Sequence, residues 1–252
     1  MRFLRSLFVW LGIAVSTAGF GLPAILAAYV PPRGDWFLRF ARGWARTILA
    51  FSGVAVTVRH AERLDPRRSF VVVANHESYS DVLVLLSRLP MQVRFLAKRS
   101  IFRVPILGWS IHAAGFVPVD RGDAARSVST VDTALKRLRS GKSLVVFPEE
   151  TRTWTGELAP FKKGAALLAL KTGHPLLPVG IAGSRKVLPR GAWNMTPGRV
   201  VLAIGTPIEV DGRSTRERDQ VMREMKDAVV RLRNEAVAEL STHECEVRSP
   251  KS

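Results

Sequence analysis

The sequence predicts one layered α/β domain: a mixed, largely parallel β-sheet flanked by helices, preceded by an N-terminal membrane-anchoring helical hairpin. Three observations support this fold class. Beyond residue 53, short β-branched or apolar runs alternate with helical patterns, several of these runs are almost entirely apolar, and residues 7–30 carry no formal charge. We therefore expect an anchor at 1–52, a main domain at 53–240 and a disordered tail at 241–252.

Length and composition limit the class of protein. The chain has 252 residues, of which 47% are hydrophobic and 23% charged, so it can bury one sizeable core. Its formal net charge of +17 favours anionic partners: phosphorylated metabolites, acidic lipid headgroups or nucleic acid. The one cysteine, Cys245, excludes an intramolecular disulfide and a cysteine-rich metal site, so a reducing, cytoplasm-facing location fits best.

The uncharged segment Leu7–Val30 follows Arg2 and Arg5. At about 1.5 Å per helical residue, it is long enough to cross a hydrocarbon core of about 30 Å. Its three glycines and Pro23 suit a kinked or re-entrant helix as well as a straight span. A cleaved signal peptide is the other alternative, although the segment is long for one and no strict Ala-x-Ala site closes it.

The next segment, Trp36–Phe51, has the period of an amphipathic helix. Aromatic and apolar side chains fall on one face and arginines on the other, which suits a helix lying among lipid headgroups. A surface helix docked on the protein core has the same pattern. The two faces consist of Phe37, Phe40, Trp44, Ile48 and Phe51 on one side and Arg39, Arg42 and Arg46 on the other.

Seven strands and several helices are expected in the main domain. The strands are Ala55–Arg59, Phe70–Ala74, Val93–Ala97, Phe116–Val119, Ser143–Phe147, Leu176–Ile181 and Val200–Ile204. The helices are Val82–Leu89, Ala124–Arg139 before Gly141, Lys163–Thr172 before Gly173, and a long one within Asp211–Leu240. Ser214, with Glu217 three residues later, predicts a capping box at the start of the last helix.

The strand Phe70–Ala74 runs into the segment Asn75–Asp81, whose sequence is NHESYSD. Functional side chains of α/β proteins gather at the carboxyl ends of strands, so His76 is well placed to act as a general base. Asp81 could fix its tautomer if His76 lies in the turn before the helix. Ser78 and Asp81 also have capping-box spacing, so Asp81 could instead satisfy backbone N–H groups, and both roles could coexist.

Three further blocks follow: Gly115–Arg121 (GFVPVDR), Val146–Arg152 (VFPEETR) and Pro175–Val179 (PLLPV). Together with the histidine segment, and in this order, they resemble the motifs of the PlsC-like glycerolipid acyltransferases, also called 1-acyl-sn-glycerol-3-phosphate or lysophosphatidic acid acyltransferases. These motifs are N-H-x4-D, G-x-x-x-x-D-R, F-P-E-G-T-R and a strand that contains proline. The resemblance covers roughly residues 50–210, and four ordered blocks are far more specific than one.

The resemblance implies a role for each matching residue. His76 would deprotonate the lysophospholipid hydroxyl, and Asp81 would orient it. Arg121, Thr151 and Arg152 would bind the acceptor phosphate, with Lys98 a further phosphate contact. Glu149 would order that cluster, and Pro178 would shape the acyl site. Arg121 and Arg152 could instead be solvated cations, and Pro178 could merely begin a strand. Similarly, Phe161–Gly164 (FKKG) resembles a family turn but could be the basic start of a helix.

Glu150 stands where the family usually has glycine, which adds a negative charge beside the expected phosphate site. Tyr79 and Ser80 replace a commonly more apolar pair. The resemblance therefore implies lysophosphatidic acid as the leading acceptor, with lyso-aminolipids or other lysophospholipids as alternatives.

The same resemblance implies the partners and the location. Phosphatidic acid for phospholipid synthesis would be the product, acyl-CoA or acyl carrier protein the donor, and no separate cofactor or metal would be needed. A membrane with anionic lipids would be a partner and nucleic acid would not, and the domain would face the cytoplasm from the cytoplasmic (inner) membrane.

Two readings from other classes compete with an acyltransferase. A non-catalytic basic module for membranes or nucleic acid would suit the net charge but would leave the four blocks unexplained. A secreted serine hydrolase would need a G-x-S-x-G segment, which the sequence lacks.

Overall fold

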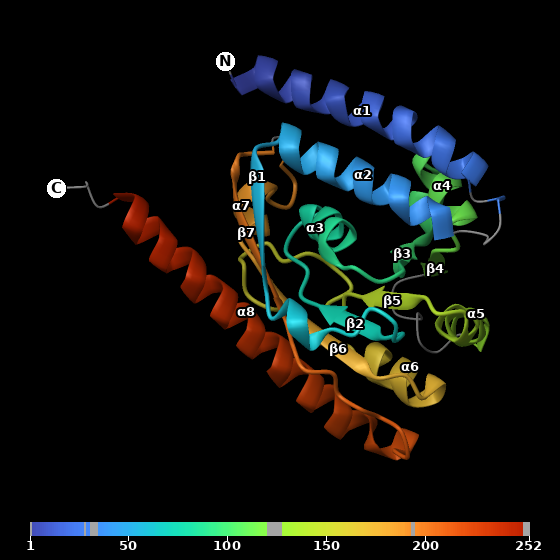
Figure 1. Ribbon diagram of the computed structural model, residues 1–252. Coiled ribbons are helices and arrows are strands. Elements are labelled where there is room, and N and C mark those ends of the chain that lie inside the picture. The colour runs from blue at the N-terminus through green and yellow to red at the C-terminus, as the bar shows by residue number, and fades with distance from the viewer. Residues whose placement is uncertain (1, 28, 31–34, 120–127, 193–194, 249–252) are drawn as a thin grey trace.

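The structure is a computed structural model that describes residues 2–27, 29–30, 35–119, 128–192 and 195–248. Its centre is one seven-stranded sheet with helices on both faces (Figure 1), as the sequence predicts. The strands are β1 (Val54–Arg59), β2 (Val71–Ala74), β3 (Val93–Lys98), β4 (Val117–Val119), β5 (Ser143–Val146), β6 (Leu176–Ala182) and β7 (Gly198–Ile204). Each corresponds to one of the seven expected ranges, with ends shifted by a residue or two.

The strand order is β1-β7-β6-β2-β5-β3-β4. All neighbouring pairs are parallel except β6 and β7, which makes the sheet mixed and largely parallel. Because β2, β3, β4 and β5 run in one direction, their carboxyl ends meet at the same edge. Val73 of β2 lies beside Val146 of β5, so the segments that follow these two strands emerge next to each other.

Two apolar clusters fill the space between the sheet and its helices. On one face lie α1 (Arg2–Ala27), α2 (Asp35–Phe51), α3 (Ser80–Arg88) and α4 (Leu107–Ala113). On the other lie α5 (Val128–Arg139), α6 (Gly164–Thr172) and α8 (Arg218–Arg248). The short elements are α7 (Ser184–Val187) and the 3-10 turns η1 (Ala61–Arg63), η2 (Arg99–Arg103) and η3 (Thr215–Glu217).

The expected N-terminal hairpin is present. Helices α1 and α2 lie side by side (Figure 1), Trp44 donates a hydrogen bond to the Thr17 hydroxyl at 3.1 Å, and Phe20 packs against Gly43. A side chain at Gly43 would meet the Phe20 ring at 2.6 Å, so this glycine permits the close packing of the two helices. By length and composition, the part of α1 from Leu7 to Ala27 is the one described helix that could cross a membrane.

Most of the apolar face of α2 packs on the protein core, as expected of a docked helix. Phe37 and Ile48 are buried in the same cluster as the strands, and Arg42 donates to the carbonyls of Leu89 and Met91 at 2.7 and 2.9 Å. Phe51 at the end of the helix is 57% exposed and packs against the exposed Phe8 of α1, so only this end of the apolar face is open to a lipid surface. The hairpin and the domain share one core, because α2 packs against both α1 and α3 and its buried side chains belong to the same cluster as those of the strands.

The C-terminal helix begins as predicted and ends later. The capping box of Ser214 and Glu217 forms, and α8 starts at Arg218. The sequence predicts disorder for residues 241–252, but residues 241–248 continue α8. The hydroxyls of Ser241 and Thr242 donate to backbone carbonyls one turn earlier. Residues 249–252 lie outside the described part of the chain. A solvated helix end needs no apolar period, so hydropathy alone misses it.

Candidate functional site

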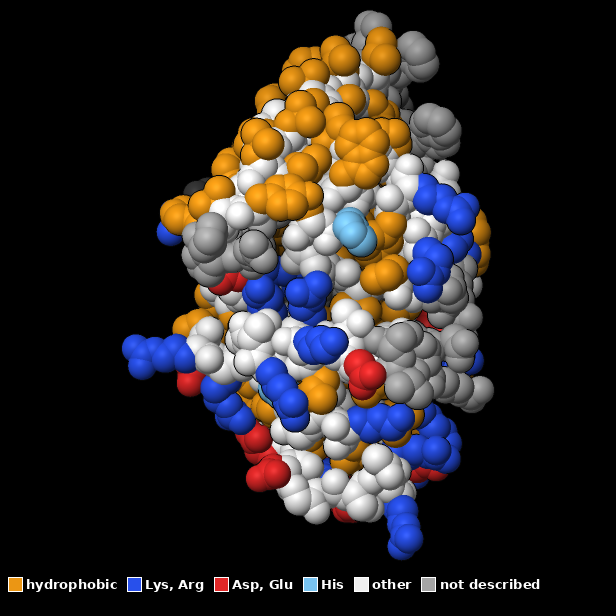
Figure 2. Space-filling view, turned by 90° about the vertical axis from the view of Figure 1, so that its right-hand side faces the viewer, with side chains coloured by type: hydrophobic (Ala, Val, Ile, Leu, Met, Phe, Trp, Pro, Cys, Tyr) orange, Lys and Arg blue, Asp and Glu red, His pale blue; other side chains and the backbone are white. Residues whose placement is uncertain are grey.

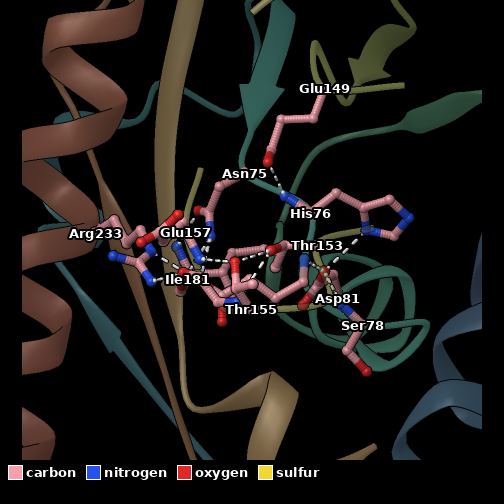
Figure 3. Close-up of polar contacts among 12 residues, drawn as sticks. Asn75, His76, Ser78, Asp81, Glu149, Thr153, Thr155, Glu157, Ile181 and Arg233 are labelled. Carbon is pink, nitrogen blue, oxygen red and sulfur yellow. Dashed lines mark hydrogen bonds and ion pairs between the residues drawn. The ribbon is translucent and has the colours of Figure 1, made fainter. Parts of the chain in front are cut away.

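The site begins where β2 ends. Asn75 is fully buried, and its side-chain amide donates to the carbonyl of Ile181 at 2.8 Å and accepts the N–H of the same residue at 2.7 Å. This pair of bonds continues the contact between β2 and β6 past the last strand residue. It fixes the backbone immediately before His76, at the carboxyl edge of the sheet (Figure 3).

His76 and Asp81 form the predicted pair. The Nδ1 atom of His76 lies 2.9 Å from Oδ2 of Asp81, and that oxygen also accepts the N–H groups of Glu77 and Ser78 at 2.8 Å each. Both proposed roles of Asp81 are therefore met by one oxygen: it orients the imidazole and caps the turn before α3. Since the carboxylate faces Nδ1, that nitrogen carries the proton, and Nε2, on the far side of the ring, is the basic atom (Figure 3).

The imidazole is held between protein groups. Its ring stacks on Phe147 with a centroid distance of 4.0 Å and an interplanar angle of 17°. The backbone N–H of His76 donates to Oε1 of Glu149 at 2.7 Å, and the N–H of Ala159 donates to Oε2 of the same carboxylate at 2.9 Å. Burial raises the pKa of Glu149, and the two backbone donors oppose that shift. Among its described contacts, Glu149 orders the histidine turn, not the cations for which the family resemblance suggested it.

His76 opens into a cavity of about 630 Å³. The charged and hydroxyl-bearing residues Lys98, Glu150, Thr151, Arg152 and Lys162 are part of its lining. Lys98 ends β3, residues 150–152 follow the neighbouring strand β5, and the N–H of Lys162 donates to the carbonyl of Pro148, so these residues form one polar end. Apolar side chains of several elements line the remainder, among them Trp10 and Phe20 of α1, Phe40 and Trp44 of α2, Leu83 and Leu86 of α3, and Leu107 and Ile111 of α4. Cationic groups at one end and an apolar wall behind them suit an amphiphile with an anionic head.

Arg152 is placed by an aromatic contact that the sequence did not indicate. Its guanidinium lies 3.5 Å from the centroid of the Tyr79 ring, and its backbone carbonyl accepts a bond from Arg190. Tyr79 remains 57% exposed. A cation over an aromatic face contributes about 0.5–1 kcal/mol at such a site, so Tyr79 favours one orientation of Arg152 at the cavity.

Glu150 has a backbone conformation that suits glycine. Its φ is 56°, in the left-handed region, where a side chain is unfavourable by roughly 1–2 kcal/mol. The residue also lines the cavity beside Thr151 and Arg152. The departure from the family pattern at this position therefore adds both backbone strain and a carboxylate to the polar end of the cavity.

Pro178 lies apart from the predicted site residues that line the cavity. Pro178 is buried within β6, paired with Val73 and close to Gly205, and it is absent from the described lining of the cavity, which corrects its expected role in the acyl site. Its strand is covered by α8, so the proline faces protein. Arg121 lies outside the described residues. Among the described residues, no group of three or more His, Cys, Asp or Glu is placed to hold a metal ion.

The sequence does not indicate that Glu77 of the histidine turn pairs with Arg233. Glu77 is buried, and Arg233 of α8 donates to its carboxylate at 2.7 Å. The two residues are 156 positions apart, so no local pattern could pair them. Lys162 of the FKKG segment also lines the cavity, and the resemblance of that segment to a family turn is the signal that points to it.

Fold and site together define an α/β protein with a histidine–aspartate pair at the carboxyl edge of a largely parallel sheet. The family model described as Acyltransferase matches residues 55–182, a range that contains strands β2 to β6 and the His76–Asp81 pair. The chain belongs to this family, the PlsC-like acyltransferases.

Individual relatives agree with this assignment. A chloroplastic 1-acyl-sn-glycerol-3-phosphate acyltransferase of Arabidopsis thaliana is 38% identical over 190 residues, covering 75% of this chain and 52% of that protein. The Saccharomyces cerevisiae 1-acyl-sn-glycerol-3-phosphate acyltransferase is 29% identical over 237 residues, covering 91% and 77%. The crystal structure of PlsC, the 1-acyl-sn-glycerophosphate acyltransferase of Thermotoga maritima, has a TM-score of 0.76 and 30% identity, covering 92% of this chain and 95% of that one. The chain spans about half the length of the first curated relatives it matches.

Replacing Glu149 by glutamine tests its contacts with the histidine turn. An amide keeps the size but offers one acceptor oxygen, so either the His76 or the Ala159 N–H loses its partner. We expect Glu149→Gln to lower the free energy of unfolding by about 1–3 kcal/mol, measured by denaturant titration. Glu150→Gln is the matched control, because no backbone N–H of the described residues donates to the Glu150 carboxylate, whereas two donate to Glu149. An equal loss in both variants would contradict the role of Glu149.

Proposed function

We propose that this protein transfers a fatty acyl group from an acyl thioester to the sn-2 hydroxyl of lysophosphatidic acid, giving phosphatidic acid. The observation that carries the proposal is the His76–Asp81 pair at a cavity with cations at one end and apolar walls behind them. The printed names of the relatives support the reaction and the acceptor.

His76 acts as the general base. Its Nε2 removes the proton of the acceptor hydroxyl while the hydroxyl oxygen attacks the thioester carbonyl, and Asp81 stabilises the imidazolium that forms. The tetrahedral intermediate then collapses, breaking the carbon–sulfur bond, and the imidazolium returns the proton to the leaving thiolate. The acyl group passes directly to the acceptor, so the reaction needs no covalent acyl-enzyme.

The polar end of the cavity binds the acceptor phosphate. Arg152, Lys98 and Lys162 supply positive charge there, and Thr151 supplies a hydroxyl. A guanidinium can engage two phosphate oxygens at once, which fixes the acceptor relative to Nε2. Arg121 belongs to this set by its motif. The apolar side chains of α1 to α4 that line the cavity accommodate the acyl chain.

The acyl donor is acyl-CoA or acyl carrier protein, and the reaction uses no separate cofactor. The protein works at the cytoplasmic membrane with its domain facing the cytoplasm. The packing of α1 against α2 and its share in the cavity wall support α1 as a retained part of the protein, not a cleaved signal peptide.

Two neighbouring elements present apolar side chains to the outside. On α1, the exposed set includes Leu7, Phe8, Leu11, Val15, Leu22 and Leu26. Val104 and Trp109, before and within α4, are also exposed, and Ile106 between them packs against Gly21 of α1. Figure 2 shows apolar side chains gathered toward the α1 side of the molecule, with Lys and Arg concentrated below them. This arrangement suits a lipid surface with anionic headgroups, on which the cavity would receive its substrate.

The reaction and the base are tested with purified protein and labelled acyl-CoA or acyl carrier protein on a panel of lysolipids. We expect transfer to lysophosphatidic acid, and His76→Ala should lower kcat by at least about 10²-fold, because general-base catalysis contributes about 10²–10⁴-fold. Thermal unfolding checks that the variant keeps its fold. Near-normal turnover by a folded His76→Ala protein would refute this mechanism.

Glu150 tests the acceptor headgroup. Its carboxylate should repel the phosphate, so Glu150→Gln should lower the KM for lysophosphatidic acid by about fivefold, which corresponds to about 1 kcal/mol, and leave the donor KM unchanged. The same residue suggests a second candidate acceptor, a lysolipid whose headgroup carries a positive charge. If wild-type protein prefers a lyso-aminolipid and Glu150→Gln loses that preference, the acceptor is that class instead.

Membrane contact beside α4 is tested with a matched pair of valines. Val104 is 44% exposed next to α1, and Val237 is 41% exposed on α8, across the sheet. We expect Val104→Asp to weaken binding to anionic lipid vesicles by roughly tenfold, because an apolar side chain leaves the interface, and Val237→Asp to have little effect. Equal effects in a flotation assay would argue against this face.

A further inference from the structure

The C-terminal helix α8 contacts the turn that carries His76. Arg233 of α8 donates from Nε to the Glu77 carboxylate at 2.7 Å and from its terminal nitrogen Nη2 to the carbonyl of Gly156 at 2.6 Å. Figure 3 shows the Arg233 side chain extending from the helix toward these loops. The Glu77 side chain is 6% exposed and that of Arg233 20%. One guanidinium therefore connects two separate loops, that of His76 and that of Arg152.

These contacts close a ring. The N–H of Gly156 donates to the Thr153 hydroxyl at 3.0 Å, and the N–H of Thr153 donates to the carbonyl of His76 at 3.3 Å. From His76 the chain leads directly to Glu77 and so back to Arg233. Arg152, which lies over the cavity, immediately precedes Thr153, so the ring joins the loop of the base to the loop of the anion site.

Glu77 is also coupled to the catalytic pair through its backbone. Its N–H donates to Oδ2 of Asp81 at 2.8 Å, the same oxygen that faces Nδ1 of His76. A displacement of Glu77 therefore changes the hydrogen bonding of the carboxylate that orients the imidazole. The side chain and the backbone of Glu77 thus link α8 to the reacting groups.

We propose that Arg233 is a positioning residue for the His76–Asp81 pair, acting through Glu77 and Gly156. This inference deepens the proposed function and rests on it for its effect on turnover. The family model ends at residue 182, so Arg233 lies outside the matched region.

A buried carboxylate without a partner would move the turn. Burial raises the pKa of Glu77, while the hydrogen bond and charge of Arg233 oppose the shift. Without the guanidinium, the Glu77 carboxylate keeps only the long contact of 3.5 Å from Nδ2 of Asn75, which does not compensate a buried charge, so the side chain takes up a proton or turns toward water and disturbs its backbone N–H. Catalytic geometry tolerates little error, because a misplacement of about 1 Å can cost about 10²-fold in rate.

The experiment separates positioning from charge compensation. Arg233→Met leaves a buried charge unpaired, whereas Glu77→Gln with Arg233→Met removes both charges and should recover most of the lost Tm. Positioning predicts that kcat stays at least about tenfold low in this stable double variant, while the KM values for donor and acceptor change little. Arg233→Lys should recover part of kcat. The control is Arg231→Met, an exposed arginine two residues earlier on α8, which should leave Tm and kcat unchanged.

A second readout does not depend on turnover. In full-length, detergent-purified protein with ¹⁵N-labelled histidine, the Nδ1–H proton of His76 should give a downfield NMR signal, assigned by its loss in His76→Gln. We expect this signal to shift or to exchange faster with water in the double variant and to persist in Arg231→Met.

The outcomes distinguish the two proposals. A double variant with recovered Tm, kcat within twofold of wild type and an unchanged signal overturns the positioning role. If wild-type protein transfers no acyl group to any lysolipid but the signal still depends on Arg233, the proposed function fails and the positioning role stands.

Discussion

The Oδ2 atom of Asp81 is the point on which the site depends. This one oxygen accepts hydrogen bonds from Nδ1 of His76 and from the backbone N–H groups of Glu77 and Ser78, with donor–acceptor distances of 2.8–2.9 Å. The same atom therefore shapes the turn between β2 and α3 and orients the imidazole that the turn carries. Local folding and chemistry cannot be altered separately here, because any change that moves the carboxylate changes both sets of hydrogen bonds.

Three buried carboxylates surround this turn, and each is compensated differently. Asp81 is held by the turn itself, Glu149 accepts backbone N–H groups from His76 and Ala159, and Glu77 pairs with Arg233. Acidic side chains are seldom buried unless they are paired or hydrogen-bonded. Their compensators come from both flanking loops and from α8, so the site needs the whole domain. The cavity needs α1 and α2 as well, since these helices form part of its wall.

Much of the fold followed from local patterns. All seven strands, the hairpin and the capping box at Ser214 were predicted, because hydrophobic period and capping chemistry are properties of neighbouring residues. The sequence did not decide whether the aromatic side chains of α2 face lipid or the protein core, because both environments select the same amphipathic pattern. The end of α8 also escaped prediction, since an exposed helical turn carries no apolar signal.

For the site, the sequence by itself determined the His76–Asp81 pair, because a spacing of five residues across a strand-to-helix turn brings the two side chains together. The family resemblance grouped Lys98, Thr151 and Arg152 around one anion, and all three line the cavity. Only the tertiary structure decided that Glu149 holds the histidine turn, that Pro178 lies away from the cavity and that Arg233 reaches Glu77. Such contacts join residues far apart in the chain, and their geometry depends on how helices pack across the sheet.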